Sequence, residues 1–206
     1  MHDAQLSRRP WAFAVFSILA GIIGWYASFE LLTERIKTLA KPGYVPNCDF
    51  SVLVTCGPNM SSWQGSVFGF TNTIFGVAMF VAPVFVGVAL LARARFDGWW
   101  WMLYQLGNLF GIILVFWLFS QSVFVLHTLC PWCMVVWTVM IPLWWVNLIR
   151  PYAVGDIPLP PRGHAFFTRL HSWVWVLIAL NYLVLAFIAQ LKLDWVSELM
   201  RFLGAA

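Results

Sequence analysis

Four long stretches of this chain contain no Asp, Glu, Lys or Arg, and they restrict the possible fold more than any other feature. They cover residues 11–29, 50–92, 98–149 and 170–191. A helix rises about 1.5 Å per residue, so about 20 residues cross a hydrocarbon core of roughly 30 Å. With 62% hydrophobic and only 10% charged residues, the chain does not have the composition of a soluble domain. The sequence therefore predicts an integral membrane protein.

The first and last stretches each hold one crossing, whereas the two middle stretches have to be divided. A polar break at residues 120–122 and Pro131 beyond it indicate two helices after residue 98. The turn-forming run 56–59 delays the helix of the second stretch to about Ser66. We expect one all-α membrane domain over residues 1–206. Its five transmembrane helices would cover residues 11–32, 66–92, 99–122, 130–149 and 172–191, with a cysteine-containing loop over 33–65.

The positions of Lys and Arg predict the orientation in the membrane. If the N-terminus is cytoplasmic, seven of the 12 basic residues lie inside: Arg8, Arg9, Arg93, Arg95, Arg150, Arg162 and Arg169. Five spans that start inside place the loop 33–65 and the turn 123–130 on the outer side. Disulfides persist on that side of a membrane rather than in a reduced cytosol. We expect a multi-pass protein of the inner (plasma) membrane with its cysteines on the periplasmic or extracellular side and no nucleic-acid partner.

All four cysteines fall into two closely spaced pairs, Cys48 with Cys56 and Cys130 with Cys133. If Cys130 caps the fourth span, Pro131 takes the first helical position and Cys133 lies one turn further on the same face. The positive helix end would then stabilise a thiolate at Cys130 and lower its pKa. Two such pairs at the ends of hydrophobic spans are typical of electron transfer from thiol to disulfide.

Two interpretations without redox chemistry stay open. A structural disulfide would explain one pair but not the reactive spacing of the other. Four thiolates could also bind zinc, but the pairs belong to separate segments, and we predict no metal. Covalent haem attachment is excluded because Met134 rather than His follows Cys133.

The order of the motifs resembles that of the vitamin K epoxide reductase family over about residues 11 to 150. The order is Cys48-x7-Cys56, then Ser61–Ser62 followed by Gly65, then the run 72–76 (Asn-Thr-Ile-Phe-Gly), then Cys-Pro-Trp-Cys at 130–133. The combination is specific, although each motif alone is weak. The chain is most similar to the bacterial homologues, which oxidise thioredoxin-like partners and reduce a quinone.

The resemblance implies a four-helix bundle around a quinone of the menaquinone or ubiquinone type, with the fifth helix outside it. It also implies that Cys48 and Cys56 are a shuttle pair and that Cys130 and Cys133 face the quinone. A reduced partner's thiolate would attack Cys48 and release Cys56. Cys56 would then attack Cys130, leaving Cys133 to pass electrons to the quinone.

Four further residues are candidates for the quinone site. Asn72 matches the family's position for an amide that donates to a quinone carbonyl, with a helix–helix hydrogen bond as the alternative. Trp137, one turn after Cys133, matches the position of a quinone-facing Tyr in vertebrate relatives, and it could instead face lipid. Ser62 matches a hydroxyl position that could bond a thiolate or a quinone oxygen. His127 could relay protons, or it could be an interfacial side chain in a turn.

Only residues 192–206 follow the last span, so we expect a separate thioredoxin-fold dithiol oxidase as the partner rather than a fused domain. The predicted function is quinone-dependent reoxidation of that partner, which drives disulfide formation in exported proteins. One alternative is a reductase whose main task is the reduction of vitamin K quinone or epoxide. The other is a membrane protein without enzymatic activity, whose cysteines are structural or bind metal.

Overall fold

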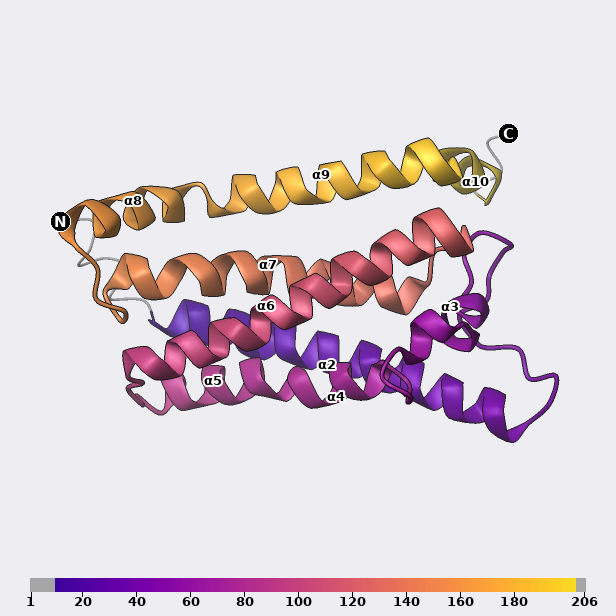
Figure 1. The fold of residues 1–206 in the computed structure, drawn as a ribbon, viewed down its shortest axis with the longest axis horizontal. Coiled ribbons are helices and arrows are strands. Elements are labelled where there is room, and N and C mark those ends of the chain that lie inside the picture. Colours follow the sequence, from indigo (N-terminus) through magenta and orange to yellow (C-terminus); the bar gives the residue numbers. More distant parts are fainter. Residues whose placement is uncertain (1–9, 203–206) are drawn as a thin grey trace.

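The helices of the computed structural model, which describes residues 10–202, run side by side as one elongated bundle (Figure 1). Five helical segments in this range are long and apolar enough to cross a membrane: Trp11–Ala40, Thr73–Leu91, Gly98–Leu126, Pro131–Val154 and Val174–Leu193. The described residues include no β-strand, only one isolated bridge. The predicted class, an all-α multi-pass membrane protein, is confirmed. Arg8 and Arg9, which contribute to the predicted orientation, lie outside the described residues.

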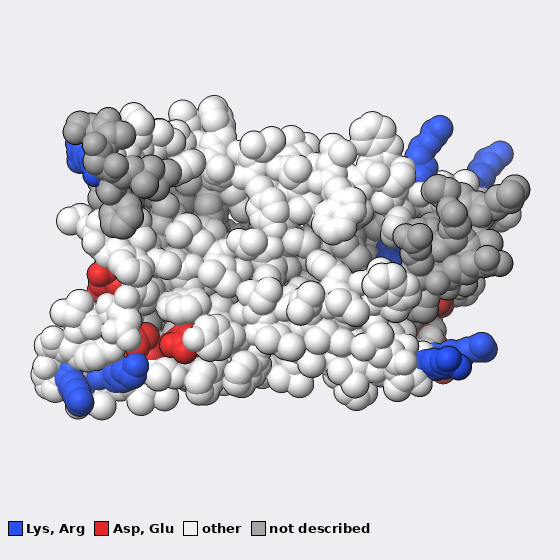
Figure 2. All heavy atoms as spheres, turned by 180° about the vertical axis from the view of Figure 1, so that it is seen from behind, with Lys and Arg blue, Asp and Glu red and all other residues white. Residues whose placement is uncertain are grey.

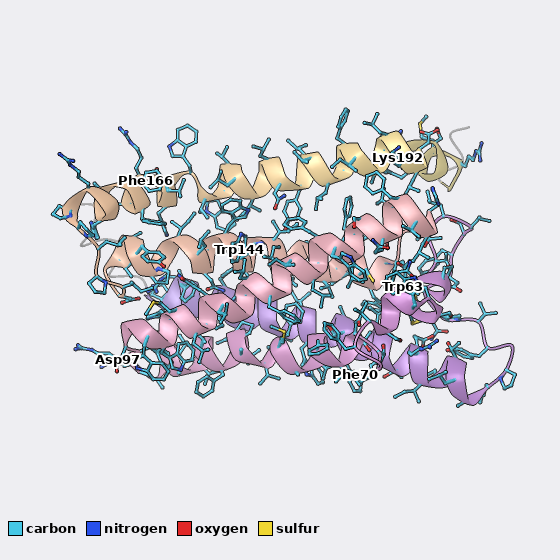
Figure 3. The ribbon with its side chains drawn as sticks, in the orientation of Figure 1. Trp63, Phe70, Asp97, Trp144, Phe166 and Lys192 are labelled. Atoms are coloured by element: carbon cyan, nitrogen blue, oxygen red, sulfur yellow. A yellow bond between two sulfur atoms is a disulfide. The ribbon has the colours of Figure 1, made fainter. Side chains whose placement is uncertain are left out.

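Charged side chains gather at the two ends of the molecule on the face shown in Figure 2, and the belt between them is white. Figure 3 likewise places Asp97 and Lys192 near opposite ends of the bundle. Such a belt matches what a hydrocarbon layer requires, because charges are expensive inside it.

Helix α2 (Pro10–Ala40) packs closely against α4 (Thr73–Met79) and α5 (Val81–Leu91). Glycines make the close approach possible. A Cβ on Gly21 would lie 2.6 Å from Val84 Cγ2, and one on Gly87 would lie 2.5 Å from the Ala14 carbonyl oxygen. Small residues at helix crossings are the usual basis of packing inside a membrane.

The start of the second span differs from the prediction. Its helix begins at Thr73 rather than near Ser66, because residues 63–66 form the short 3-10 helix η1 (Trp63–Ser66) and a turn follows. The Asn72 side chain holds this turn, with Nδ2 donating to the Gln64 carbonyl at 2.6 Å and Oδ1 accepting from the Val67 N–H at 3.2 Å. The sequence contained no local sign of these contacts.

The other helix ends also extend beyond or shift from the predicted limits. Helix α2 continues to Ala40 rather than ending at 32, so the cysteine loop is shorter than 33–65. Helix α6 (Gly98–Gln121) runs on into a π-helical turn, η2 (Ser122–Leu126). Helix α7 (Pro131–Val154) continues beyond the predicted limit at residue 149. Gly155 caps it in the left-handed conformation, with a φ of 85°.

The fifth spanning helix, α9 (Val174–Leu193), lies at the edge of the bundle against α7 and η2 (Figure 1). Helix α8 (Pro161–Ser172) leads into it from one end of the molecule, and α10 (Trp195–Phe202) follows it at the other. The predicted peripheral position of this helix is therefore confirmed.

Two prolines inside α7, Pro142 and Pro151, leave backbone carbonyls without their usual helical donors. A proline at position i has no N–H for the carbonyl at i−4, so Thr138 and Asn147 are the residues affected. The Tyr182 hydroxyl of α9 donates to the Thr138 carbonyl at 2.5 Å, and Gln105 Nε2 of α6 donates to the Asn147 carbonyl at 3.1 Å. Neighbouring helices thus supply the donors that α7 lacks, which fixes α6 and α9 on it.

We predict that Gln105→Leu destabilises the protein by about 1–2 kcal/mol, because it leaves the Asn147 carbonyl unpaired inside the membrane. Thermal unfolding in detergent would measure the loss. The matched control is the same change in a Pro151→Ala background, where Ala supplies its own N–H to Asn147. The bond that Gln105 accepts from Tyr152 is lost in both backgrounds and cancels in the comparison. An equal loss in both would contradict this explanation.

Candidate redox centre and adjoining cavity

Three of the four cysteine sulfurs meet at the end of the bundle where α2 ends and α7 begins. Cys48 and Cys56 form a disulfide with their Cα atoms 5.8 Å apart, and Cys130 and Cys133 are free thiols. The Cys130 sulfur lies 3.2 Å from the Cys56 sulfur, and both residues are completely buried. A thiol beside a disulfide sulfur is the arrangement that thiol–disulfide exchange requires.

A short backbone pairing sets this contact. Val54 and Leu129 form a parallel bridge, in which the Thr55 N–H donates to the Leu129 carbonyl at 3.0 Å and the Leu129 N–H donates to the Leu53 carbonyl at 2.7 Å. Each cysteine follows shortly after this bridge in its own segment. The pairing joins residues that are far apart in the chain, so the spacing of cysteines in the sequence did not predict it.

Asp49 fixes the position of Cys56 from across the loop. Its Oδ1 accepts the backbone N–H of Cys56 at 2.6 Å and that of Gly57 at 3.2 Å. These N–H groups belong to the start of helix α3 (Gly57–Ser61), which no side chain of its own N-cap satisfies. Asp49 lies seven residues before Cys56, so no local pattern in the sequence predicts that it caps this helix.

Asn59 connects α3 to the segment that precedes Cys130. Its Nδ2 donates to the Thr128 hydroxyl at 2.9 Å, and its Oδ1 accepts a hydrogen bond from the Ser122 hydroxyl. The backbone bridge, Asp49 and Asn59 together hold Cys56 against Cys130. Asn59 was not singled out in the sequence, where its Gly-Pro-Asn context indicated only a turn.

Cys130 is the N-cap of α7 and Pro131 is its first residue, which is the local geometry the sequence predicted. The Cys133 thiol donates a hydrogen bond to the Cys130 sulfur, and this lowers the pKa of Cys130 from its ordinary value. The backbone N–H groups of Cys133 and Trp132 act in the same direction, while burial and the Asp49 charge oppose it. The thiolate at Cys130 is thus the better stabilised member of the pair.

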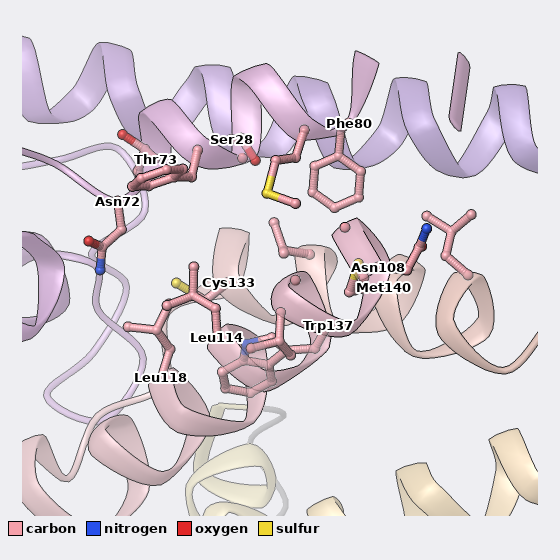
Figure 4. Close-up of a pocket in the computed structure, with 18 of the residues that line it drawn as sticks. Ser28, Asn72, Thr73, Phe80, Asn108, Leu114, Leu118, Cys133, Trp137 and Met140 are labelled. Carbon is pink, nitrogen blue, oxygen red and sulfur yellow. The ribbon is translucent and has the colours of Figure 1, made fainter. Parts of the chain in front are cut away.

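A cavity of about 400 Å³ begins beside Cys133 and extends between the α4–α5 span and helices α6 and α7. Most of its lining side chains are apolar. Figure 4 shows the Cys133 sulfur between Asn72 and Trp137, with Asn108 toward the other end of the view. Cys133 lines this cavity, whereas Cys48, Cys56 and Cys130 do not. Cys133 therefore joins the buried sulfur cluster to a space that opens among the membrane helices.

The structure brings two of the four quinone-site candidates to the cavity. Asn72 and Trp137 line it, and both are buried. Ser62 and His127 are not among its lining residues, so the structure does not bring them to the predicted quinone site. The Ser62 hydroxyl donates to the Asn59 carbonyl at 3.4 Å. His127 is exposed, in a left-handed backbone conformation that turns its ring toward the Val125 carbonyl, with Nδ1 3.2 Å from that oxygen.

The Asn72 amide already holds the Gln64–Val67 turn, but it keeps one N–H beyond the bond to Gln64. Four serine and threonine residues that the sequence did not single out for this site also line the cavity: Ser28, Thr71, Thr73 and Ser122. The sequence alone did not separate them from the other Ser and Thr residues.

Residues 15–148 match the vitamin K epoxide reductase family. The matched range includes all four cysteines and every residue that lines the cavity. No curated protein matches the chain.

We predict that Cys133→Ala raises the pH at which Cys130 becomes a thiolate, because the variant lacks the thiol that donates to it. At a pH between the two pKa values, Cys130 would be ionised beside Cys133 and protonated in the variant. The ultraviolet absorbance of the thiolate measures this, in a background with Cys48→Ala and Cys56→Ala to prevent exchange. Cys133→Ser keeps a hydroxyl donor and should retain much of the lowering. Identical titration of the Ala and Ser variants would contradict the role of the donor.

Proposed function

Because the chain belongs to the vitamin K epoxide reductase family, we propose that this membrane oxidoreductase oxidises a separate thioredoxin-fold dithiol protein and passes the electrons to a quinone. The observation that carries the proposal is the unbroken series from the Cys48–Cys56 disulfide through Cys130 to Cys133 at the cavity. The product would be the partner protein with its disulfide restored, ready to oxidise thiols of exported proteins.

The reaction begins at Cys48. A thiolate of the reduced partner attacks the Cys48 sulfur, forms a mixed disulfide and releases Cys56 as a thiolate. The partner's second thiolate then attacks the partner sulfur of the mixed disulfide, which releases the Cys48 thiolate and the oxidised partner. Two electrons now reside on the Cys48 and Cys56 thiols.

Transfer to the inner pair uses the 3.2 Å contact between the Cys56 and Cys130 sulfurs. The Cys56 thiolate attacks Cys130 of an oxidised Cys130–Cys133 pair, and Cys133 leaves. Cys48 then attacks Cys56, which re-forms the first disulfide and releases Cys130. The structure, with one disulfide and two free thiols, has the bonding expected after this step.

The cavity residues fit a quinone as the electron acceptor. The walls are mostly apolar, as a lipid-soluble molecule requires, and the remaining Asn72 N–H suits a carbonyl oxygen that gains negative charge. A quinone bound there would take up two electrons and two protons as Cys130 and Cys133 form a disulfide. Trp137 would bound the ring on the α7 side without contributing a hydroxyl group.

We further propose that the sulfur cluster faces the outside of the cell. The short connection 92–97 between two spans and helix α8 lie at the end of the bundle opposite α3 and the cysteine loop (Figure 1). They contain Arg93, Arg95, Arg162 and Arg169. Basic residues in short loops favour the cytoplasmic side. The Cys48–Cys56 disulfide would then lie in the compartment where disulfides persist.

We predict that sealed membrane vesicles in their native orientation oxidise an added, reduced thioredoxin-fold protein, and that inverted vesicles do not. The reaction should depend on quinone in the lipid.

We predict that Cys130→Ala and Cys133→Ala abolish the reaction with every reductant, because the electrons have no other route to the cavity. Cys48→Ala should lose activity with the protein partner but keep part of it with a small dithiol. Equal loss in Cys48→Ala and Cys133→Ala with dithiothreitol would contradict this division of roles.

We predict a trapped disulfide between Cys56 and Cys130 in the Cys48→Ala, Cys133→Ala double variant. Only these two sulfurs remain, and they already lie in contact, so mild oxidation should join them in most molecules. Mass spectrometry of unreduced proteolytic peptides would detect the bond.

The matched control for this trap is the Cys56→Ala, Cys133→Ala variant, which keeps Cys48 and Cys130. It should form less internal disulfide, since the sulfur that lies 3.2 Å from Cys130 is that of Cys56 rather than that of Cys48. Two free thiols in the first variant, in folded protein under oxidising conditions, would rule out the route.

A further inference from the structure

A buried carboxylate lies at the cysteine end of α2. Glu34 is 1% exposed, and both of its oxygens accept hydrogen bonds. Lys37 Nζ donates to Oε1 at 2.7 Å, while the Tyr44 hydroxyl and the Asn47 backbone N–H each donate to Oε2 at 3.0 Å. A buried charge is costly unless such partners surround it, so this set of donors offsets the burial of Glu34.

Two of these donors belong to the segment that leads to the redox centre. Tyr44 and Asn47 lie in residues 42–47, between the end of α2 and Cys48. The backbone hydrogen bonds at the two ends of this segment are local, from the Tyr44 N–H to the Lys41 carbonyl and from the Asp49 N–H to the Pro46 carbonyl, both at 3.1 Å. Glu34 receives hydrogen bonds from both Tyr44 and Asn47, and among the described residues Lys37, its own ion-pair partner, adds a side-chain contact from α2 to Tyr44.

Cys48 is therefore held from both sides. Its preceding residue, Asn47, is bonded to Glu34, and its following residue, Asp49, is bonded to the N–H groups of Cys56 and Gly57. Under these restraints Cys48 is only 3% exposed. A protein thiolate cannot approach a sulfur that is so covered, so the segment has to move before the partner can react.

The two restraints act on different parts of the site. Asp49, the Val54–Leu129 bridge and Asn59 hold Cys56 against Cys130 without any contribution from Glu34. Loss of the Glu34 contacts would free residues 42–47 while this inner contact remained in place. The structure thus separates access to Cys48 from transfer to Cys130.

We propose that Glu34 is a positioning residue that latches residues 42–47 over the redox centre and so controls how fast Cys48 becomes accessible to a dithiol. The inference rests on the proposed function in one respect, the assignment of Cys48 as the atom that the partner attacks. The latch itself can be tested without any partner protein.

The test is the rate at which tris(2-carboxyethyl)phosphine reduces the Cys48–Cys56 disulfide in the purified full-length protein in detergent. We expect Glu34→Gln to accelerate reduction about tenfold, which corresponds to about 1.4 kcal/mol in the opening equilibrium. Tyr44→Phe removes one donor and should accelerate it by a smaller factor. The matched control is Glu30→Gln, which removes the same charge one turn earlier on α2 and should leave the rate unchanged.

A second measurement excludes a general loss of structure. In the Cys48→Ala, Cys133→Ala background, Glu34→Gln should not slow formation of the Cys56–Cys130 disulfide. Slower formation, or a reduction rate that equals that of wild type or of Glu30→Gln, would overturn the latch. If phosphine reduction is accelerated but oxidation of the partner protein is absent in every variant, the latch stands and the proposed partner reaction is wrong.

Discussion

The backbone's need for hydrogen-bond partners in a medium without water determines most of this structure. Inside a bilayer each N–H and C=O group has to be paired within the protein, which leaves helices as the spanning elements here. The prolines of α7 show how strict the requirement is, because each carbonyl that they leave unpaired has a donor from a neighbouring helix. The same requirement therefore forms the helices and selects which of them pack together.

The cysteines lie at an end of the bundle, where non-helical segments can also pair their backbone N–H and C=O groups. At the end of the bundle, two non-helical segments pair through a few backbone bonds, and a carboxylate from one of them satisfies the start of α3. Those bonds place two sulfurs in contact, although the cysteines belong to segments 74 positions apart. Cys133, one helical turn further along α7, lines the apolar cavity and so links the loop region to it.

The parts that could be predicted from sequence are those specified locally. The uncharged stretches predicted five spans, and the Cys-Pro-Trp-Cys run predicted the cap of α7. The order of the cysteine motifs indicated the family, which the match over residues 15–148 confirms. The prediction was wrong or incomplete where contacts between residues far apart in the sequence determine the local structure. The start of α4 depends on the turn that Asn72 holds, and the roles of Asp49 and Asn59 depend on a loop pairing that no periodicity reveals.

The candidate residues of the quinone site were predicted by position in the chain, without the orientation of their side chains. The resemblance made Ser62 a candidate, and the position of His127 shortly before Cys130 made it another. Neither argument showed that the Ser62 hydroxyl donates to a loop carbonyl or that the His127 side chain is exposed. Asn72 and Trp137 line the cavity because the turn before α4 and the helical turn after Cys133 orient them toward it. Their roles toward a quinone remain part of the proposal.

The complete burial of Cys56 and Cys130 has a consequence for the selectivity of the electron path. In the proposed route, electrons would pass between two sulfurs that are closed to solvent, so small thiols outside the protein would not reach the middle of the route. Small thiols such as glutathione would enter the proposed route only at its ends, at Cys48 after the segment 42–47 has moved and at Cys133 from the cavity. Direct reaction of a small thiol with Cys56 or Cys130 would require this end of the bundle to unfold locally.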